Sequence, residues 1–61
     1  MFGEFQKVRI KATGLIGEIV DISEINGKKH YVVESNEKYA PGGYGDIWPL
    51  FDCSEEELEP I

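Results

Sequence analysis

The sequence predicts an all-β fold, a small barrel of about five strands with a short C-terminal helical turn. Three observations predict it: apolar and charged residues alternate over 7–12, an Asn26-Gly27 pair separates two apolar stretches, and an apolar run over 47–51 contains Pro49. A chain of 61 residues buries only about 60% of the surface that its unfolded form exposes. Residues 1–61 are therefore expected to form a single domain.

The first predicted strand spans 7–12, because its side chains alternate with the period of two that one buried face requires. The apolar positions are Val8, Ile10 and Ala12, and the charged positions are Lys7, Arg9 and Lys11. Thr13 and Gly14 then turn the chain. Gly17 lies within the apolar stretch that follows, where a glycine marks a bulge, a bend or a close backbone approach.

The Asn26-Gly27 pair predicts a two-residue type I′ hairpin turn. Counting outward from the turn gives six cross-strand pairs: Ile25 with Lys28, Glu24 with Lys29, Ser23 with His30, Ile22 with Tyr31, Asp21 with Val32, and Val20 with Val33. Val20, Ile22, Tyr31 and Val33 then share one side, which we expect to be buried. Ile19 and Ile22 cannot both face inward on a regular strand. Either a bulge over 17–19 changes the phase, or a loop covers Ile19.

The second half of the chain is predicted to contain a loop over 35–46, which is rich in turn-forming residues. Pro49 cannot donate a ladder hydrogen bond, so it belongs on an edge strand, at a strand start or at a bulge. Ser54 and Glu57 have the spacing of a capping box that opens a short helical turn. We expect Leu58 and Ile61 to anchor the C-terminus as a last short strand.

The net charge of −6 is unevenly distributed: residues 1–33 hold five basic and four acidic side chains, and residues 34–61 hold one basic and eight acidic. An acidic domain repels phosphates, which disfavours a nucleic-acid partner. The single Cys53 cannot form an intramolecular disulfide, and no segment has the pattern of a secretory signal or the ~18 apolar residues of a membrane span. These features predict a cytoplasmic protein with no membrane partner.

The predicted order of strand, glycine-bearing turn, long hairpin, loop, edge strand, helical turn and terminal strand resembles the SH3-like small barrel. The segment over 8–22 is similar to the KOW motif of ribosomal and transcription-factor barrels, with Gly17 at the position of the motif's glycine. RNA-binding KOW motifs commonly carry basic residues just before that glycine, whereas this chain has Leu15 and Ile16. The wider resemblance implies a module that binds peptides, proteins or RNA through its loops and rarely implies catalysis.

Aromatic residues in and after the 35–46 loop are the leading candidates for a binding site. Tyr39, Tyr44 and Trp48 are flanked by Glu37 and Asp46. Rings beside carboxylates suit a proline-rich peptide or a cation held over a ring face. The alternative is that Trp48 belongs to the core and that the tyrosines fold the loop over the end of the barrel.

A basic surface is the alternative site, for a KOW-like RNA-binding or ribosome-associated protein. It consists of Lys7, Arg9, Lys11, Lys28 and Lys29. These residues contact phosphates only if the first strand and the hairpin tip lie side by side; otherwise they form an ordinary solvated face.

An enzyme is the least favoured class. Cys53 and His30 lack the third, orienting residue of a nucleophilic site. The acidic residues Asp46, Asp52 and 55–57 have no metal-binding spacing, and the glycines over 42–45 lack the ending of a phosphate-binding loop. We therefore expect a non-enzymatic interaction module without catalytic residues, cofactor or metal ion.

Overall fold

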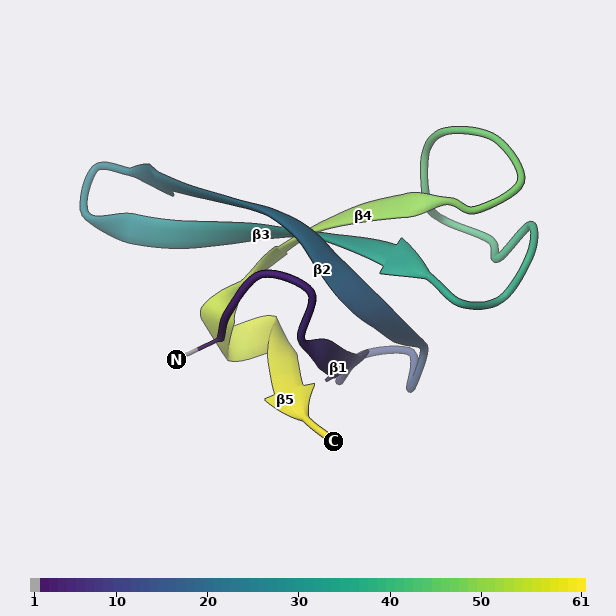
Figure 1. The fold of residues 1–61 in the computed structure, drawn as a ribbon, viewed down its shortest axis with the longest axis horizontal. Helices are drawn as coiled ribbons and strands as arrows, with labels where there is room; N and C mark the ends of the chain where they lie inside the picture. The colour runs from purple at the N-terminus through teal and green to yellow at the C-terminus, as the bar shows by residue number, and fades with distance from the viewer. Residues whose placement is uncertain (1) are drawn as a thin grey trace.

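The computed structural model describes residues 2–61 and contains one antiparallel sheet of five strands. In chain order the elements are β1 (Lys7–Ile10), β2 (Ile16–Ile25), β3 (Lys28–Ser35), β4 (Leu50–Ser54), the 3-10 turn η1 (Glu55–Glu57) and β5 (Leu58–Pro60). Their order across the sheet is β4-β3-β2-β1-β5, so β4 and β5 form its two open edges and η1 connects them (Figure 1). This architecture confirms the all-β prediction of about five strands with a short C-terminal helical turn. Within residues 2–61, no helix is long and apolar enough to cross a membrane.

The hairpin of β2 and β3 has the predicted turn and most of the predicted register. Asn26 and Gly27 both have positive φ, 53° and 79°, as a type I′ turn requires. The five pairs nearest the turn, from Ile25 with Lys28 to Asp21 with Val32, are confirmed. The sixth is wrong: Val33 pairs with Ile19, because a bulge at Val20 shifts the register by one residue.

The bulge decides which side chains of β2 enter the core. Ile19 is fully buried, whereas Val20 and Ile22 are only partly buried, so the prediction that Val20 lies in the core is wrong. Of the two explanations for Ile19, a change of phase is the one found, although the bulge lies one residue after 17–19. A one-residue slip exchanges the two faces of a strand. Ile19, before the bulge, and Ile22, after it, therefore lie on the same side of the sheet, where they pair with Val33 and Tyr31.

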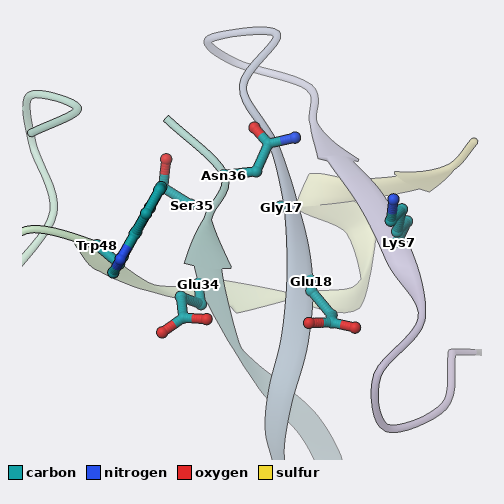
Figure 2. Close-up of a pocket in the computed structure, with 7 residues that line it drawn as sticks. All are labelled: Lys7, Gly17, Glu18, Glu34, Ser35, Asn36 and Trp48. Atoms are coloured by element: carbon teal, nitrogen blue, oxygen red, sulfur yellow. The ribbon is translucent and has the colours of Figure 1, made fainter. Parts of the chain in front are cut away.

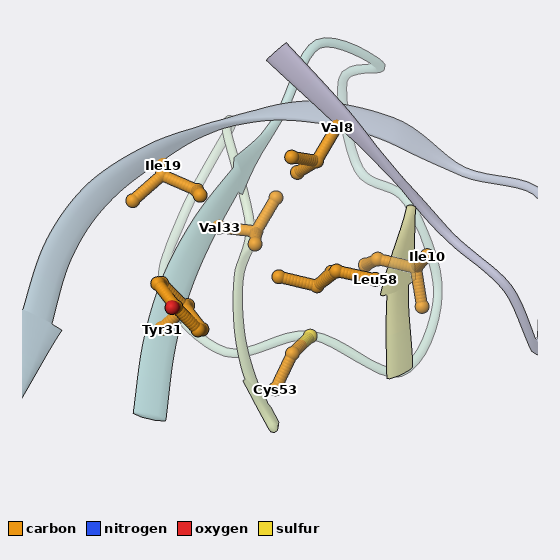
Figure 3. Packing of buried hydrophobic residues seen from close by; sticks show 7 residues of the cluster. All are labelled: Val8, Ile10, Ile19, Tyr31, Val33, Cys53 and Leu58. Carbon is orange, nitrogen blue, oxygen red and sulfur yellow. The ribbon is translucent and has the colours of Figure 1, made fainter. Parts of the chain in front are cut away.

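Both ends of the sheet wrap around a single apolar core (Figure 3). The buried cluster consists of Val8, Ile10, Ile19, Tyr31, Val33, Cys53 and Leu58. Tyr31 is the largest fully buried side chain, and Phe2 packs edge-on against its ring with 5.6 Å between centroids. Ala12 is exposed, in contrast to the prediction, because β1 ends at Ile10 and the chain already turns at 11–13.

The C-terminal elements follow the predicted local signals. β4 begins directly after Pro49 and is an edge strand, where a missing donor is tolerated. The backbone N–H of Ser54 donates to Oε1 of Glu57 at 2.7 Å, as part of the predicted capping box, and η1 starts there. Leu58 anchors β5 in the core, but Ile61 is 64% exposed and does not contribute to that anchor.

Candidate functional site

The long connection between β3 and β4, residues 36–49, is held in shape by hydrogen bonds to its backbone. The Ser35 hydroxyl accepts a hydrogen bond from the Glu37 N–H at 2.9 Å and donates one to the Glu37 carbonyl at 2.8 Å. The Tyr39 N–H donates to the Ile47 carbonyl at 2.9 Å, which closes the loop on itself, and Ala40 is buried beneath it. The loop is therefore a packed unit that can present side chains at fixed positions.

Large apolar side chains of this loop face solvent. Tyr39 is 69% exposed, Tyr44 50%, and Ile47 and Trp48 are each 43% exposed. The interpretation of Trp48 as a core residue is thus wrong. Lys38 places its Nζ 5.6 Å from the centroid of the Trp48 ring, within the range of a cation–π contact.

Tyr44 pairs with the first residue of the edge strand β4. Its backbone forms an isolated bridge with Leu50, through hydrogen bonds of 2.7 and 2.9 Å. Its hydroxyl donates to Oδ1 of Asp52 at 3.1 Å. Desolvation raises the pKa of the Tyr44 hydroxyl, and the hydrogen bond to Asp52 and the charges of Asp52 and Asp21 raise it further. The Tyr44 hydroxyl thus donates its hydrogen bond on the outer, solvent-facing side of the sheet, where Asp52 and Asp21 lie.

A groove of about 250 Å³ separates Trp48 from β1 (Figure 2). Its lining consists of Lys7, Gly17, Glu18, Glu34, Ser35, Asn36 and Trp48. Figure 2 shows the indole at one wall, Lys7 at the other, and the carboxylates of Glu18 and Glu34 on the two strands between them. Of the five residues expected at an aromatic site, Trp48 alone lines this groove.

The other expected aromatic-site residues occupy different positions. Tyr44 lies beside β4, and Tyr39 and Asp46 are exposed in the loop. Glu37 lines a separate hollow with Leu15 and Pro41. Glu18 and Glu34 were not among the expected site residues. The sequence could indicate them only through the alternation that points every second side chain outward, and on β2 that alternation depends on the position of the bulge.

The basic residues are distributed over two distant places. Lys7 pairs with Glu18, and Lys29 pairs with Glu24. Glu24 lies six residues further along β2 than Glu18, so the two lysines are separated by ~20 Å. Figure 1 shows the tip of the β2–β3 hairpin extending away from β1. Lys11 is exposed in the turn after β1.

Acidic side chains accompany both basic groups. Arg9 forms an ion pair with Glu59 at 3.1 Å. Lys28 and Lys29 share a groove with Glu55 and Glu56 of η1. Backbone and Ser54 hydrogen bonds lower the pKa of Glu56, and the charges of Lys28 and His30, which line the same groove, lower it further.

Cys53 and His30 lie on opposite faces of the sheet. Cys53 pairs with Tyr31 and belongs to the buried cluster, whereas His30 pairs with Ser54 at the next position, where side chains point outward. Desolvation raises the pKa of the Cys53 thiol from 9.0 to about 11, and the charges of Glu57 and Asp52 add to this effect. The thiol is therefore protonated and shielded, the opposite of a reactive nucleophile. Among residues 2–61, no three metal-ligating side chains are grouped together.

Cys53 is expected to resist alkylation by iodoacetamide in the folded protein at neutral pH and to react fully in denaturant. Because its pKa is raised in the folded state, the associated stability is present below pH 9 and is lost as pH rises towards 11. The thermal midpoint of the wild type should fall more steeply over this interval than that of Cys53→Ala. Equal slopes, or rapid alkylation of the folded protein, would contradict this description of the thiol.

Comparison of the chain with protein-family profiles, with curated proteins and with solved structures gave no significant match.

Proposed function

We propose that this protein is a non-enzymatic, cytoplasmic interaction module that binds a protein or peptide through the 36–49 loop and the groove beside it. The supporting observation is the exposure of Tyr39, Tyr44 and Trp48 on a loop whose backbone is tied at both ends. In a protein this small, large aromatic side chains left in solvent do not contribute to its own core, and aromatic residues are enriched at interaction sites. We assign the barrel to the SH3-like class on its strand order, with the KOW-like glycine at Gly17.

A KOW-like role in RNA or ribosome binding is the second candidate, and the position of Gly17 at the start of β2 is what favours it. Its proposed contacts are Lys7, Arg9, Lys11, Lys28 and Lys29. The ~20 Å between the two basic groups and the acidic neighbours of each make it the weaker candidate. Phosphate binding needs several basic side chains converging on one surface.

Trp48→Ala tests the proposed function. We expect this variant to lose a partner that the immobilised wild-type protein captures from an extract of its native cells, because truncation of a central aromatic contact commonly weakens binding by ~10-fold or more. Its thermal midpoint should change little, since Trp48 lies outside the buried cluster. Captured molecules are identified by mass spectrometry, with and without prior nuclease treatment.

Ile25→Ala is the matched control, because Ile25 is a similarly exposed apolar residue at the distant hairpin tip. The control should retain the partner. Capture that persists in Trp48→Ala, or that disappears after nuclease treatment, would contradict binding of a protein at the loop; the second result would favour the RNA-binding role.

A further inference from the structure

We infer that the partner is basic: an extended protein segment with lysine or arginine at alternate positions, bound across the outer face of β2, β3 and β4 beside Trp48. This inference rests on the proposed function and adds the chemistry of the partner. We call this surface the acidic face; it contains Glu18, Asp21, Glu34 and Asp52.

Strand register places these four carboxylates in two rows. Glu18 pairs with Glu34, and Glu34 with Leu50, which bridges to Tyr44. In the next row, Val32 has Asp21 on one side and Asp52 on the other. Directly paired residues project from the same face of a sheet, so both rows face outward, opposite to the core residues Val33 and Tyr31.

The first row contains a pair of like charges, and Lys7 lies directly opposite Glu18 on the other side of β2. Glu18 and Glu34 are directly opposite one another, and like charges in such a pair destabilise the sheet. Neither carboxylate has a basic partner within 4 Å among residues 2–61, where the ion pair found is that of Arg9 with Glu59. Figure 2 shows both carboxylates between the Trp48 indole and Lys7. A second cation, supplied by a partner on the Glu34 side of the groove, would offset this repulsion.

Lys38 already shows the kind of group that the Trp48 ring accepts. Its ammonium lies over the indole at 5.6 Å, and the same indole forms one wall of the groove that contains Glu18 and Glu34. A partner's cation on that ring face would therefore displace Lys38. The internal lysine is a competitor, and its removal should strengthen binding.

The spacing of the two rows favours an extended segment. Glu34 and Val32, which mark the rows on β3, are two residues apart, or ~7 Å. Alternate side chains of an extended peptide have the same separation. Lysines at every second position can thus meet both rows, which a single compact cation cannot do.

The direct test is a fluorescence titration, because Trp48 is the only tryptophan and reports on its own site. The probes are short capped peptides that alternate lysine with serine, glutamate with serine, or glutamine with serine. We expect the lysine peptide alone to change Trp48 emission and to raise the thermal midpoint, with an affinity that falls as salt increases.

Charge-matched variants separate this site from general attraction to an acidic protein. Glu34→Gln should weaken lysine-peptide binding by about 2–5-fold and, by relieving the repulsion with Glu18, raise the thermal midpoint of the free protein by about 2–4 °C. Glu24→Gln makes the same charge change at the hairpin tip, where Glu24 pairs with Lys29. This control should show neither the weakened binding nor the gain in stability.

Lys38→Gln should strengthen peptide binding by about 2–5-fold, and more than Lys11→Gln, which removes the same charge from a distant turn. The inference is overturned if the lysine peptide does not bind. It is also overturned if the two variants of either matched pair, Glu34→Gln with Glu24→Gln or Lys38→Gln with Lys11→Gln, change the peptide affinity equally. If Trp48-dependent capture of a partner is nevertheless observed, the proposed function stands and only the basic chemistry of the partner is wrong. A response to an oligonucleotide instead of the lysine peptide also overturns it.

Discussion

Tyr31→Ala is expected to lower the free energy of unfolding by about 3–5 kcal/mol, which is comparable to the whole stability of a domain this small. The ring is fully buried, joins the cluster that includes Ile19 and Val33, and packs against Phe2. Its loss leaves a cavity that a five-stranded sheet of 61 residues cannot fill by rearrangement. Circular dichroism during urea and thermal unfolding measures the effect.

Tyr31→Phe separates the packing of the ring from the hydrogen bond of its hydroxyl. That hydroxyl donates to Oε1 of Glu55 at 3.2 Å, a partly buried contact. Its removal should lower the free energy of unfolding by about 0.5–1.5 kcal/mol, so this variant should remain folded. If Tyr31→Ala unfolds at the same urea concentration as Tyr31→Phe, the ring does not support the core as described.

Gly17→Ala is expected to lower the free energy of unfolding by about 3 kcal/mol. A Cβ at this position would overlap the Glu34 carbonyl oxygen and would lie 2.6 Å from Cγ1 of Val33. The carbonyl belongs to the backbone of β3, an interior strand, so it cannot move aside without disturbing the β2–β3 ladder. The glycine is needed here for a close backbone approach, one of the three roles that its position in the sequence suggested.

Gly3→Ala is the matched control for Gly17→Ala. A Cβ at Gly3 meets nothing within 4 Å, and its φ does not lie in the left-handed region. The control should match the wild type in urea and thermal unfolding. Similar midpoints for Gly17→Ala and Gly3→Ala would show that β2 and β3 can separate at Gly17 without cost, and that the close approach is not essential.

Local chemistry in the sequence predicted the turns and most of each strand. Asn26-Gly27 requires positive φ at two successive residues, which determines a tight turn and, by counting outward, the five pairs next to it. Pro49 marked the start of an edge strand, because a residue without an N–H cannot continue a ladder. Ser54 and Glu57 marked the start of η1 through their hydrogen bond.

The candidate site was only partly accessible from the sequence. Trp48 could be proposed from its chemistry, since an aromatic ring near carboxylates is a recognisable combination. Its exposure depends on how the 36–49 loop packs, through contacts such as Tyr39 with Ile47 that have no sequence signature. Spacing alone therefore left open whether the ring belonged to the core or to the surface.

By itself the sequence determined an all-β chain with a hairpin centred on Asn26-Gly27, because alternation and turn chemistry act between near neighbours. Only the tertiary structure decided that Val20 bulges. Without that slip, the predicted register would continue with Ile19 opposite Glu34 and place Glu18 and Glu34 on different faces. Ile19 and Val20 are similarly apolar, so the choice between them depends on which side chain fills the core, and that choice also creates the acidic face.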